Sequence, residues 1–195
     1  MNKISLKEQE LVLKVSNNVD IDKWDEGKYY QFIEKLTNGR QYQEEAILTS
    51  LRFMCGGQYS NTKELVEENF KDNIHLQEKF TTLQNFFDNL YFSDRYTANI
   101  DLATATGKSW VLYGIARIML DANIVDQVLL LVPSITIERE LTDKFKNFAS
   151  DSNLNDTLIG APPRIINGTE SIVKGTICIE NRDAIYNNTR SSIID

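Results

Sequence analysis

The chain has 195 residues, of which 42% are hydrophobic and 25% are charged, and its net charge at pH 7 is -7. This length allows one or two domains with a sizeable core, and the acidic balance argues against a small nucleic-acid-binding module, which is usually basic. The single histidine, His75, lies in a polar stretch and nearly excludes a catalytic triad or a histidine-rich metal site.

The first 92 residues contain no proline and have the pattern of a mostly helical region. Apolar side chains recur there at helical spacing in four stretches, and we interpret their aromatic members as core packing. The expected helices cover about residues 22–36 with a stop near Gly39, residues 41–55 before Gly56, residues 62–70 with a cap at Asn61 or Thr62, and residues 74–91.

From about residue 93 onward, short strands alternate with helices. Apolar and polar residues alternate over 96–102, which predicts a strand, and a buried helix is expected to follow it. The apolar run 128–132 is typical of a strand buried on both faces of a parallel sheet. Ser134 is expected to cap a helix over 135–148, and shorter strands are expected over 164–167 and 176–180. The sequence therefore predicts an α/β fold with a parallel sheet over residues 93–195, after the helical region 1–92.

The strongest ligand signal is the string Leu102-Ala103-Thr104-Ala105-Thr106-Gly107-Lys108-Ser109. A strand, a loop of small residues and then a helix form the usual setting of a phosphate-binding loop. In such a loop Lys108 reaches the β- and γ-phosphates, and the Ser109 hydroxyl binds Mg²⁺. Only the last three residues match the strict pattern, since Leu102 and Ala105 occupy positions where glycine is common.

A second element, Arg40-Gln41-Tyr42-Gln43, opens the helix that lies about 60 residues before the loop. A glutamine amide carries a donor and an acceptor, so Gln43 can pair with the edge of adenine while Tyr42 packs against the base. Alone, the tetrapeptide is an ordinary helix start. Together with the loop it predicts an ATP site.

These segments resemble a known family. Residues 101–111 are similar to the first ATPase motif of superfamily 2 helicases, closest to the restriction subunits of type III, and more distantly type I, restriction–modification systems. Arg40, Tyr42 and Gln43 are placed like the adenine-reading Q motif, and residues 130–140 resemble the family's segment that contains Val-Pro-Ser. The resemblance covers about residues 40–56 and 96–185.

The resemblance implies a RecA-like motor fold that is only partly present here, with ATP and Mg²⁺ as ligands and duplex DNA as the track. It gives Thr104, Ala105, Thr106 and Gly107 backbone contacts to phosphate, with Lys108 as the catalytic charge-neutralising residue and Ser109 as the Mg²⁺ ligand. It also places Pro133 and Ser134 at the nucleic-acid backbone, although for Ser134 a plain helix cap is an equally good interpretation. A modification methyltransferase subunit is a candidate partner, and endonuclease activity a candidate property of the whole enzyme.

ATP hydrolysis in this class needs an apolar strand that ends in Asp-Glu. The one Asp-Glu pair, Asp25-Glu26, lies in the helical region, and Ile179-Glu180 lacks the aspartate. We therefore expect an N-terminal fragment of a larger protein that binds nucleotide but hydrolyses it negligibly. Two alternatives stay open: a P-loop phosphotransferase related to kinases, which Gln43 and the Val-Pro-Ser segment disfavour, and a non-catalytic interaction module with a degenerate loop.

The remaining features concern the compartment. Cys55 and Cys178 are far apart and form no Cys-x-x-Cys pair, so we expect reduced core residues rather than a disulfide or metal site. No apolar run approaches the roughly 20 residues of a membrane span, and the N-terminus has no signal-peptide core. We expect a cytoplasmic protein without a membrane partner.

Overall fold

The computed structural model describes residues 13–90, 94–168 and 170–183. Backbone contacts divide the chain into two compact units, one formed by residues 1–25 and 48–101 and the other by residues 26–47 and 102–195. Helix α2 (Gln41–Cys55) contributes to both units. The sequence analysis instead divides the chain near residue 92, where a mostly helical region gives way to alternating strands and helices. That division rests on the type of secondary structure and not on contacts, and it stays a prediction.

In the first unit, α3 (Thr62–Asp72), α4 (Ile74–Lys79) and α5 (Leu83–Phe87) follow the end of α2. The side chain of Asn61 accepts a hydrogen bond from the Glu64 N–H, so the predicted cap of α3 is confirmed. The single helix expected over 74–91 is wrong, because Phe80 has an extended backbone and Thr82 caps a new helix. This break brings the ring centroids of Phe80 and Phe86 to 4.8 Å in a buried cluster.

The strand expected over residues 96–102 is also wrong, since the structure has no strand there. The neighbouring backbone bonds to a helix instead: the Thr62 N–H donates to the Arg95 carbonyl at 3.0 Å, and the Thr97 N–H donates to Thr62 Oγ1 at 3.0 Å. Tyr96 is tied to the Tyr59 carbonyl through its hydroxyl. A strand needs a neighbour to receive its N–H and C=O groups, and an alternating pattern alone does not supply one.

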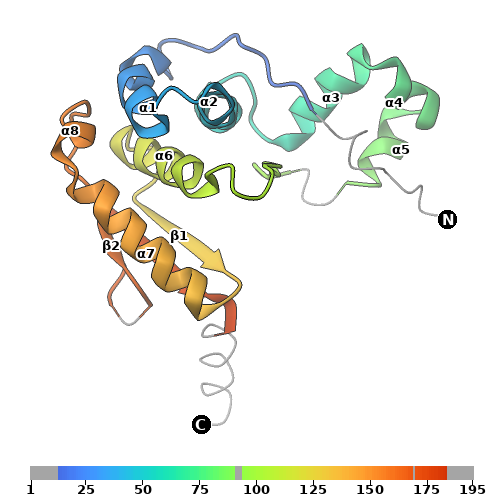
Figure 1. The fold of residues 1–195 in the computed structure, drawn as a ribbon. Coiled ribbons are helices and arrows are strands. Elements are labelled where there is room, and N and C mark those ends of the chain that lie inside the picture. Colours follow the sequence, from blue (N-terminus) through green and yellow to red (C-terminus); the bar gives the residue numbers. More distant parts are fainter. Residues whose placement is uncertain (1–12, 91–93, 169, 184–195) are drawn as a thin grey trace. The chain divides into compact units, whose positions relative to one another are not determined.

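The second unit holds the sheet (Figure 1). Its helical part comprises a 3-10 turn (Glu26–Tyr29), α1 (Tyr30–Thr37), α6 (Lys108–Asp121), α7 (Ile135–Ser150) and α8 (Ser152–Asn155). The sheet comprises β1 (Gln127–Val132), β2 (Arg164–Ile166) and β3 (Thr176–Asn181), which lie in the order β1-β3-β2 and pair in parallel. The predicted α/β fold with a parallel sheet is thus confirmed, whereas the first helix begins later than residue 22.

Strand β1 differs from its expected environment. It lies at the edge of the sheet, and Leu129 and Leu131 are 51% and 57% exposed. Val132, which points to the other face, is buried, with 8% of its surface exposed. The expectation of a strand buried on both faces is therefore wrong within the described residues, because one face of β1 has no cover there.

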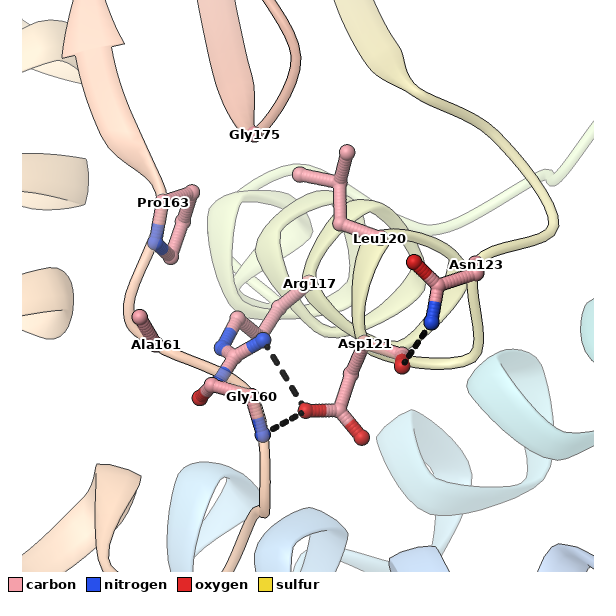
Figure 2. A pocket seen from close by; sticks show the side chains of 8 residues that line it. All are labelled: Arg117, Leu120, Asp121, Asn123, Gly160, Ala161, Pro163 and Gly175. Atoms are coloured by element: carbon pink, nitrogen blue, oxygen red, sulfur yellow. Dashed lines mark hydrogen bonds and ion pairs between the residues drawn. The ribbon is translucent and has the colours of Figure 1, made fainter.

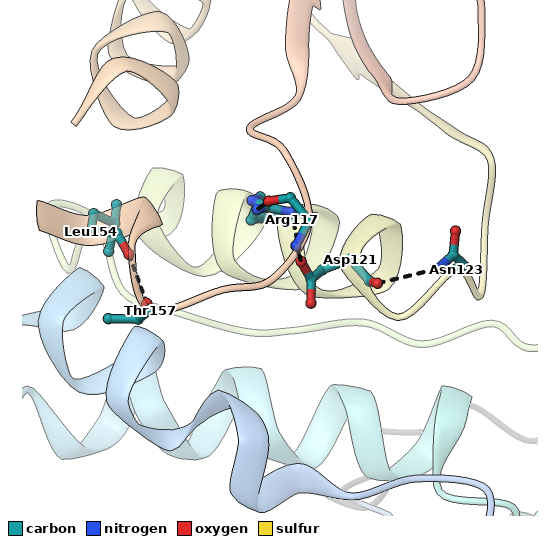
Figure 3. Close-up of polar contacts among 6 residues, drawn as sticks. Arg117, Asp121, Asn123, Leu154 and Thr157 are labelled. Atoms are coloured by element: carbon teal, nitrogen blue, oxygen red, sulfur yellow. Dashed lines mark hydrogen bonds and ion pairs between the residues drawn. The ribbon is translucent and has the colours of Figure 1, made fainter. Parts of the chain in front are cut away.

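A buried ion pair fastens the C-terminal end of α6 to the loop that leads into β2 (Figures 2 and 3). Arg117 Nη1 lies 3.3 Å from Asp121 Oδ1, and both side chains are at least nine-tenths buried. The same Asp121 oxygen accepts the Gly160 N–H at 2.8 Å, while Arg117 Nη2 donates to the Gly160 carbonyl at 2.5 Å. Gly160 is thus held through both its N–H and its carbonyl, beside a small pocket that includes Pro163 and Gly175.

Two further expectations concern side chains. Cys55 and Cys178 are both free and buried, as predicted, and burial raises the pKa of the Cys55 thiol to about 11. His75, which lies in a polar stretch of the sequence, is exposed. Among the helices that the structure describes, none is both long enough and apolar enough to cross a bilayer.

Candidate nucleotide-binding site

The predicted phosphate loop runs directly into the N-terminus of α6. Gly107 precedes the helix with φ +84°, and Ala105 has φ +66°, so two residues of the loop adopt a left-handed backbone. The Thr106 Oγ1 donates to the Ala103 carbonyl at 2.6 Å and closes the turn. Because the first N–H groups of a helix lack intrahelical partners, this arrangement is suited to an anion.

Gln43 and Tyr42, from the first turn of α2, both bond to this loop. Gln43 Nε2 donates to the Thr106 carbonyl at 2.6 Å, and the Tyr42 hydroxyl donates to the same carbonyl at 3.1 Å. Gln43 is buried, with 1% of its surface exposed. The structure therefore brings the two sequence elements together across 63 positions of the chain.

The amide of Gln43 is only partly used by the protein. Its Oε1 is buried and has no hydrogen-bond partner in the part of the chain that the structure describes. The donor half of the amide is engaged by Thr106, so the simultaneous donor and acceptor pairing that the sequence suggests is not preformed. The unpartnered acceptor is complementary to an amino group such as N6 of adenine.

Two side chains border the position that a Cβ of Gly107 would occupy. A Cβ on this residue would meet Gln43 Nε2 and would lie 3.0 Å from Cε3 of Trp110. No side chain fits there without moving Gln43 or Trp110, and the positive φ disfavours one as well. The sequence motif explains this glycine, but it gave no role to the aromatic residue that follows Gly-Lys-Ser.

The remaining residues of the predicted site are placed as follows. Lys108 is exposed at the start of α6 and Ser109 is half-buried, while Thr104 and Ala105 are exposed on the loop. Arg40 is also exposed, and its Nη1 donates to the Thr37 carbonyl at the end of α1 at 3.1 Å. Within the described ranges, no group of three or more His, Cys, Asp or Glu side chains could hold a metal ion.

Pro133 and Ser134 follow the carboxyl end of β1. Pro133 is exposed, and the Ser134 side chain accepts a hydrogen bond from the Ile137 N–H at 3.4 Å, which confirms the predicted cap of α7. Beside it, Glu138 Oε2 accepts the Asn181 N–H at 3.1 Å and so links α7 to β3.

The cap at Ser134 gives a stability prediction. Ser134→Ala removes the acceptor for the Ile137 N–H and is expected to lower the free energy of unfolding by about 1 kcal/mol. Urea unfolding of the full chain measures this change, and Ser134→Asp, which keeps an acceptor, should lose much less. Equal stability of the alanine variant and the unaltered chain would show that the hydroxyl does not cap α7.

One comparison with known proteins returned a match. A family model described as "Type III restriction enzyme, res subunit" matches residues 36–193, which is more than half of the chain. This range contains α2, the loop, α6 and all three strands. No curated protein and no solved structure matches the chain.

Proposed function

The chain belongs to the type III restriction enzyme res-subunit family, and from this premise we propose that it forms the ATP-binding part of an ATP-dependent DNA translocase. The family implies a helicase-like, ATP-binding domain with a RecA-like P-loop fold. The observation that carries the proposal is the contact of Gln43 and Tyr42 with the Thr106 carbonyl, because it joins a base-reading element to a phosphate loop.

In this proposal the triphosphate lies along residues 104–107 and the N-terminus of α6. Backbone N–H groups there bond to phosphate oxygens, and the Lys108 ammonium neutralises their charge. Ser109 would supply a hydroxyl to Mg²⁺, and a bound Mg²⁺ would offset the negative charge of the phosphates. Gln43 Oε1 accepts a hydrogen bond from the N6 amino group of adenine, and this hydrogen bond selects ATP over GTP.

This stretch of sequence is proposed to bind nucleotide without hydrolysing it. Hydrolysis needs an Asp-Glu pair at the end of an apolar strand, and the only such pair in the chain, Asp25-Glu26, lies elsewhere. β3 ends instead in Glu180 and Asn181. The sequence therefore contains no Asp-Glu pair placed to complete the proposed Mg²⁺ site.

The DNA track and the partner are also proposals. Pro133 and Ser134 are the candidates for contact with the phosphate backbone, through an N–H of the α7 N-terminus, since the Ser134 side chain already caps that helix. Duplex DNA, and a modification methyltransferase subunit, are the partners that the family suggests. The free buried thiols suit a reducing cytoplasm.

Calorimetry on the full chain with Mg·ATP and Mg·GTP tests the proposal. We expect binding of Mg·ATP in preference to Mg·GTP. We expect Gln43→Ala to weaken Mg·ATP binding by up to about tenfold and to remove the preference, since one hydrogen bond contributes about 0.5–1.5 kcal/mol. Gln84→Ala, an exposed glutamine of the first unit, is the control.

Two results would contradict it. Equal affinities for both nucleotides in the unaltered chain would remove the base-reading role of Gln43. An absence of binding at millimolar nucleotide would favour a non-catalytic interaction module. In the complete enzyme, an ATPase rate that duplex DNA leaves unchanged would argue for a P-loop phosphotransferase rather than a translocase.

A further inference from the structure

Trp110 lies where the phosphate loop meets the rest of the second unit. It follows Ser109 on α6, and its ring edge approaches Gly107, where a Cβ would lie 3.0 Å from Cε3. Gln43 also faces the position that a Cβ of Gly107 would occupy, so an aromatic ring and a buried amide both border this glycine.

The same ring contacts helix α7. The centroid of Trp110 lies 5.7 Å from that of Phe148, and Lys144 Nζ lies 5.9 Å from the Trp110 centroid, within the range of a cation–π interaction. Phe148 packs in turn on Tyr113 of α6 at 5.1 Å. Tyr113 is completely buried, so this end of the aromatic cluster is fixed in the core.

We propose that Trp110 is a positioning residue that holds the phosphate loop in the shape that receives the nucleotide and connects this loop to α7. Resting on the proposed function, this inference adds a residue that the phosphate-loop pattern does not contain. A side chain that touches the glycine before the helix limits the motion of the loop, and a rigid loop loses less conformational entropy when the nucleotide binds. Because the ring also contacts Phe148 and Lys144 of α7, a displacement of α7 changes the support of the loop.

The chain has two tryptophans, and this makes the proposal measurable. Trp24 belongs to the first unit and is 2% exposed, so it serves as an internal reference. Mg·ATP is expected to change the fluorescence of the unaltered chain, and Trp110→Phe is expected to lose that change. The phenylalanine variant keeps an aromatic ring against Gly107, so its Mg·ATP affinity should stay within about twofold, whereas Trp110→Ala should lose about tenfold.

A double-mutant cycle tests the connection to α7. Phe148 lies on α7, and Phe148→Leu alone should weaken Mg·ATP binding by about threefold. In a chain that already carries Trp110→Ala it should have no further effect, because the effects of substitutions at coupled residues are not additive. Phe87→Leu is the matched control, since Lys63 Nζ lies over the Phe87 ring at 5.0 Å in the first unit. Calorimetry measures the affinities, and thermal unfolding identifies variants that are merely less stable.

The outcomes separate this proposal from the proposed function. If the unaltered chain binds Mg·ATP but Trp110→Ala binds equally well, or if the effects of Trp110→Ala and Phe148→Leu simply add, the positioning role is overturned and the nucleotide site stands. If the unaltered chain does not bind Mg·ATP, both are overturned. Loss of affinity in Trp110→Ala, its rescue in Trp110→Phe and a non-additive cycle together support it.

Discussion

Replacement of Lys108 by alanine is expected to abolish detectable Mg·ATP binding by the chain and to abolish ATP hydrolysis by the complete enzyme. Lys108 is the cation of the Gly-Lys-Ser motif and is exposed at the first position of α6, where it can reach phosphate oxygens. Charge-assisted hydrogen bonds contribute about 1.5–3 kcal/mol each, so the loss of this ammonium lowers affinity by about 10- to 100-fold or more. Calorimetry with Mg·ATP measures the change directly.

The control for this experiment lies on the same unit. Lys146 is an exposed lysine of α7, and Lys146→Ala removes the same charge without touching the loop. Both variants should unfold at nearly the same urea concentration as the unaltered chain, because substitutions of exposed side chains change stability little. Wild-type affinity in Lys108→Ala, or wild-type ATPase activity of the complete enzyme with that substitution, would show that Gly107-Lys108-Ser109 is not a phosphate loop.

The parts of this site that are local in sequence were predictable. The motif Gly107-Lys108-Ser109 predicts the helix that begins at Lys108. Ser134, which follows an apolar run, predicts the cap of α7. Both depend on hydrogen bonds between residues a few positions apart, whose geometry any helix N-terminus repeats. The parallel pairing of β1 with β3 likewise follows from the alternation of strands and helices.

The parts that depend on a distant neighbour were not predictable. Residues 96–102 alternate like a strand, yet the Arg95 and Thr97 backbone bonds to Thr62, and no alternating pattern reports which partner is nearest. The apolar stripe of residues 74–91 continues through the break at Phe80, because both pieces serve one cluster. The donor of Gln43 is directed to the Thr106 carbonyl, 63 positions away, and a single sequence does not reveal this contact.

Removal of one partner from the Arg117–Asp121 pair is expected to have the largest effect on stability. The side chain of Arg117 is only 1% exposed, and Asp121→Ala removes the carboxylate that neutralises its buried charge. The substitution also removes the acceptor of the Gly160 N–H. The breaking of a buried ion pair destabilises by about 3–5 kcal/mol, a large part of the stability of a domain of this size. The midpoint of urea unfolding measured on the full chain should fall accordingly.

The double variant Arg117→Met with Asp121→Leu makes the expectation more precise. It removes both charges and refills their volume with apolar side chains, and such replacements are often neutral or stabilising. It should therefore be more stable than Asp121→Ala, although the hydrogen bonds to the Gly160 N–H and to the Gly160 carbonyl are both lost. Equal instability of the two variants would mean that the role of the pair is to hold Gly160 rather than to neutralise a buried charge.

These variants also distinguish the roles of the two ends of α6. The loop and Lys108 lie at its N-terminus, and the ion pair lies at its last turns. If α6 only has to be folded to bind nucleotide, the double variant should bind Mg·ATP with unchanged affinity wherever it remains folded. A weaker affinity in a chain that unfolds normally would show instead that the fastening of α6 to the Gly160 loop sets the position of its N-terminus, so that the ion pair acts on the nucleotide site through the helix.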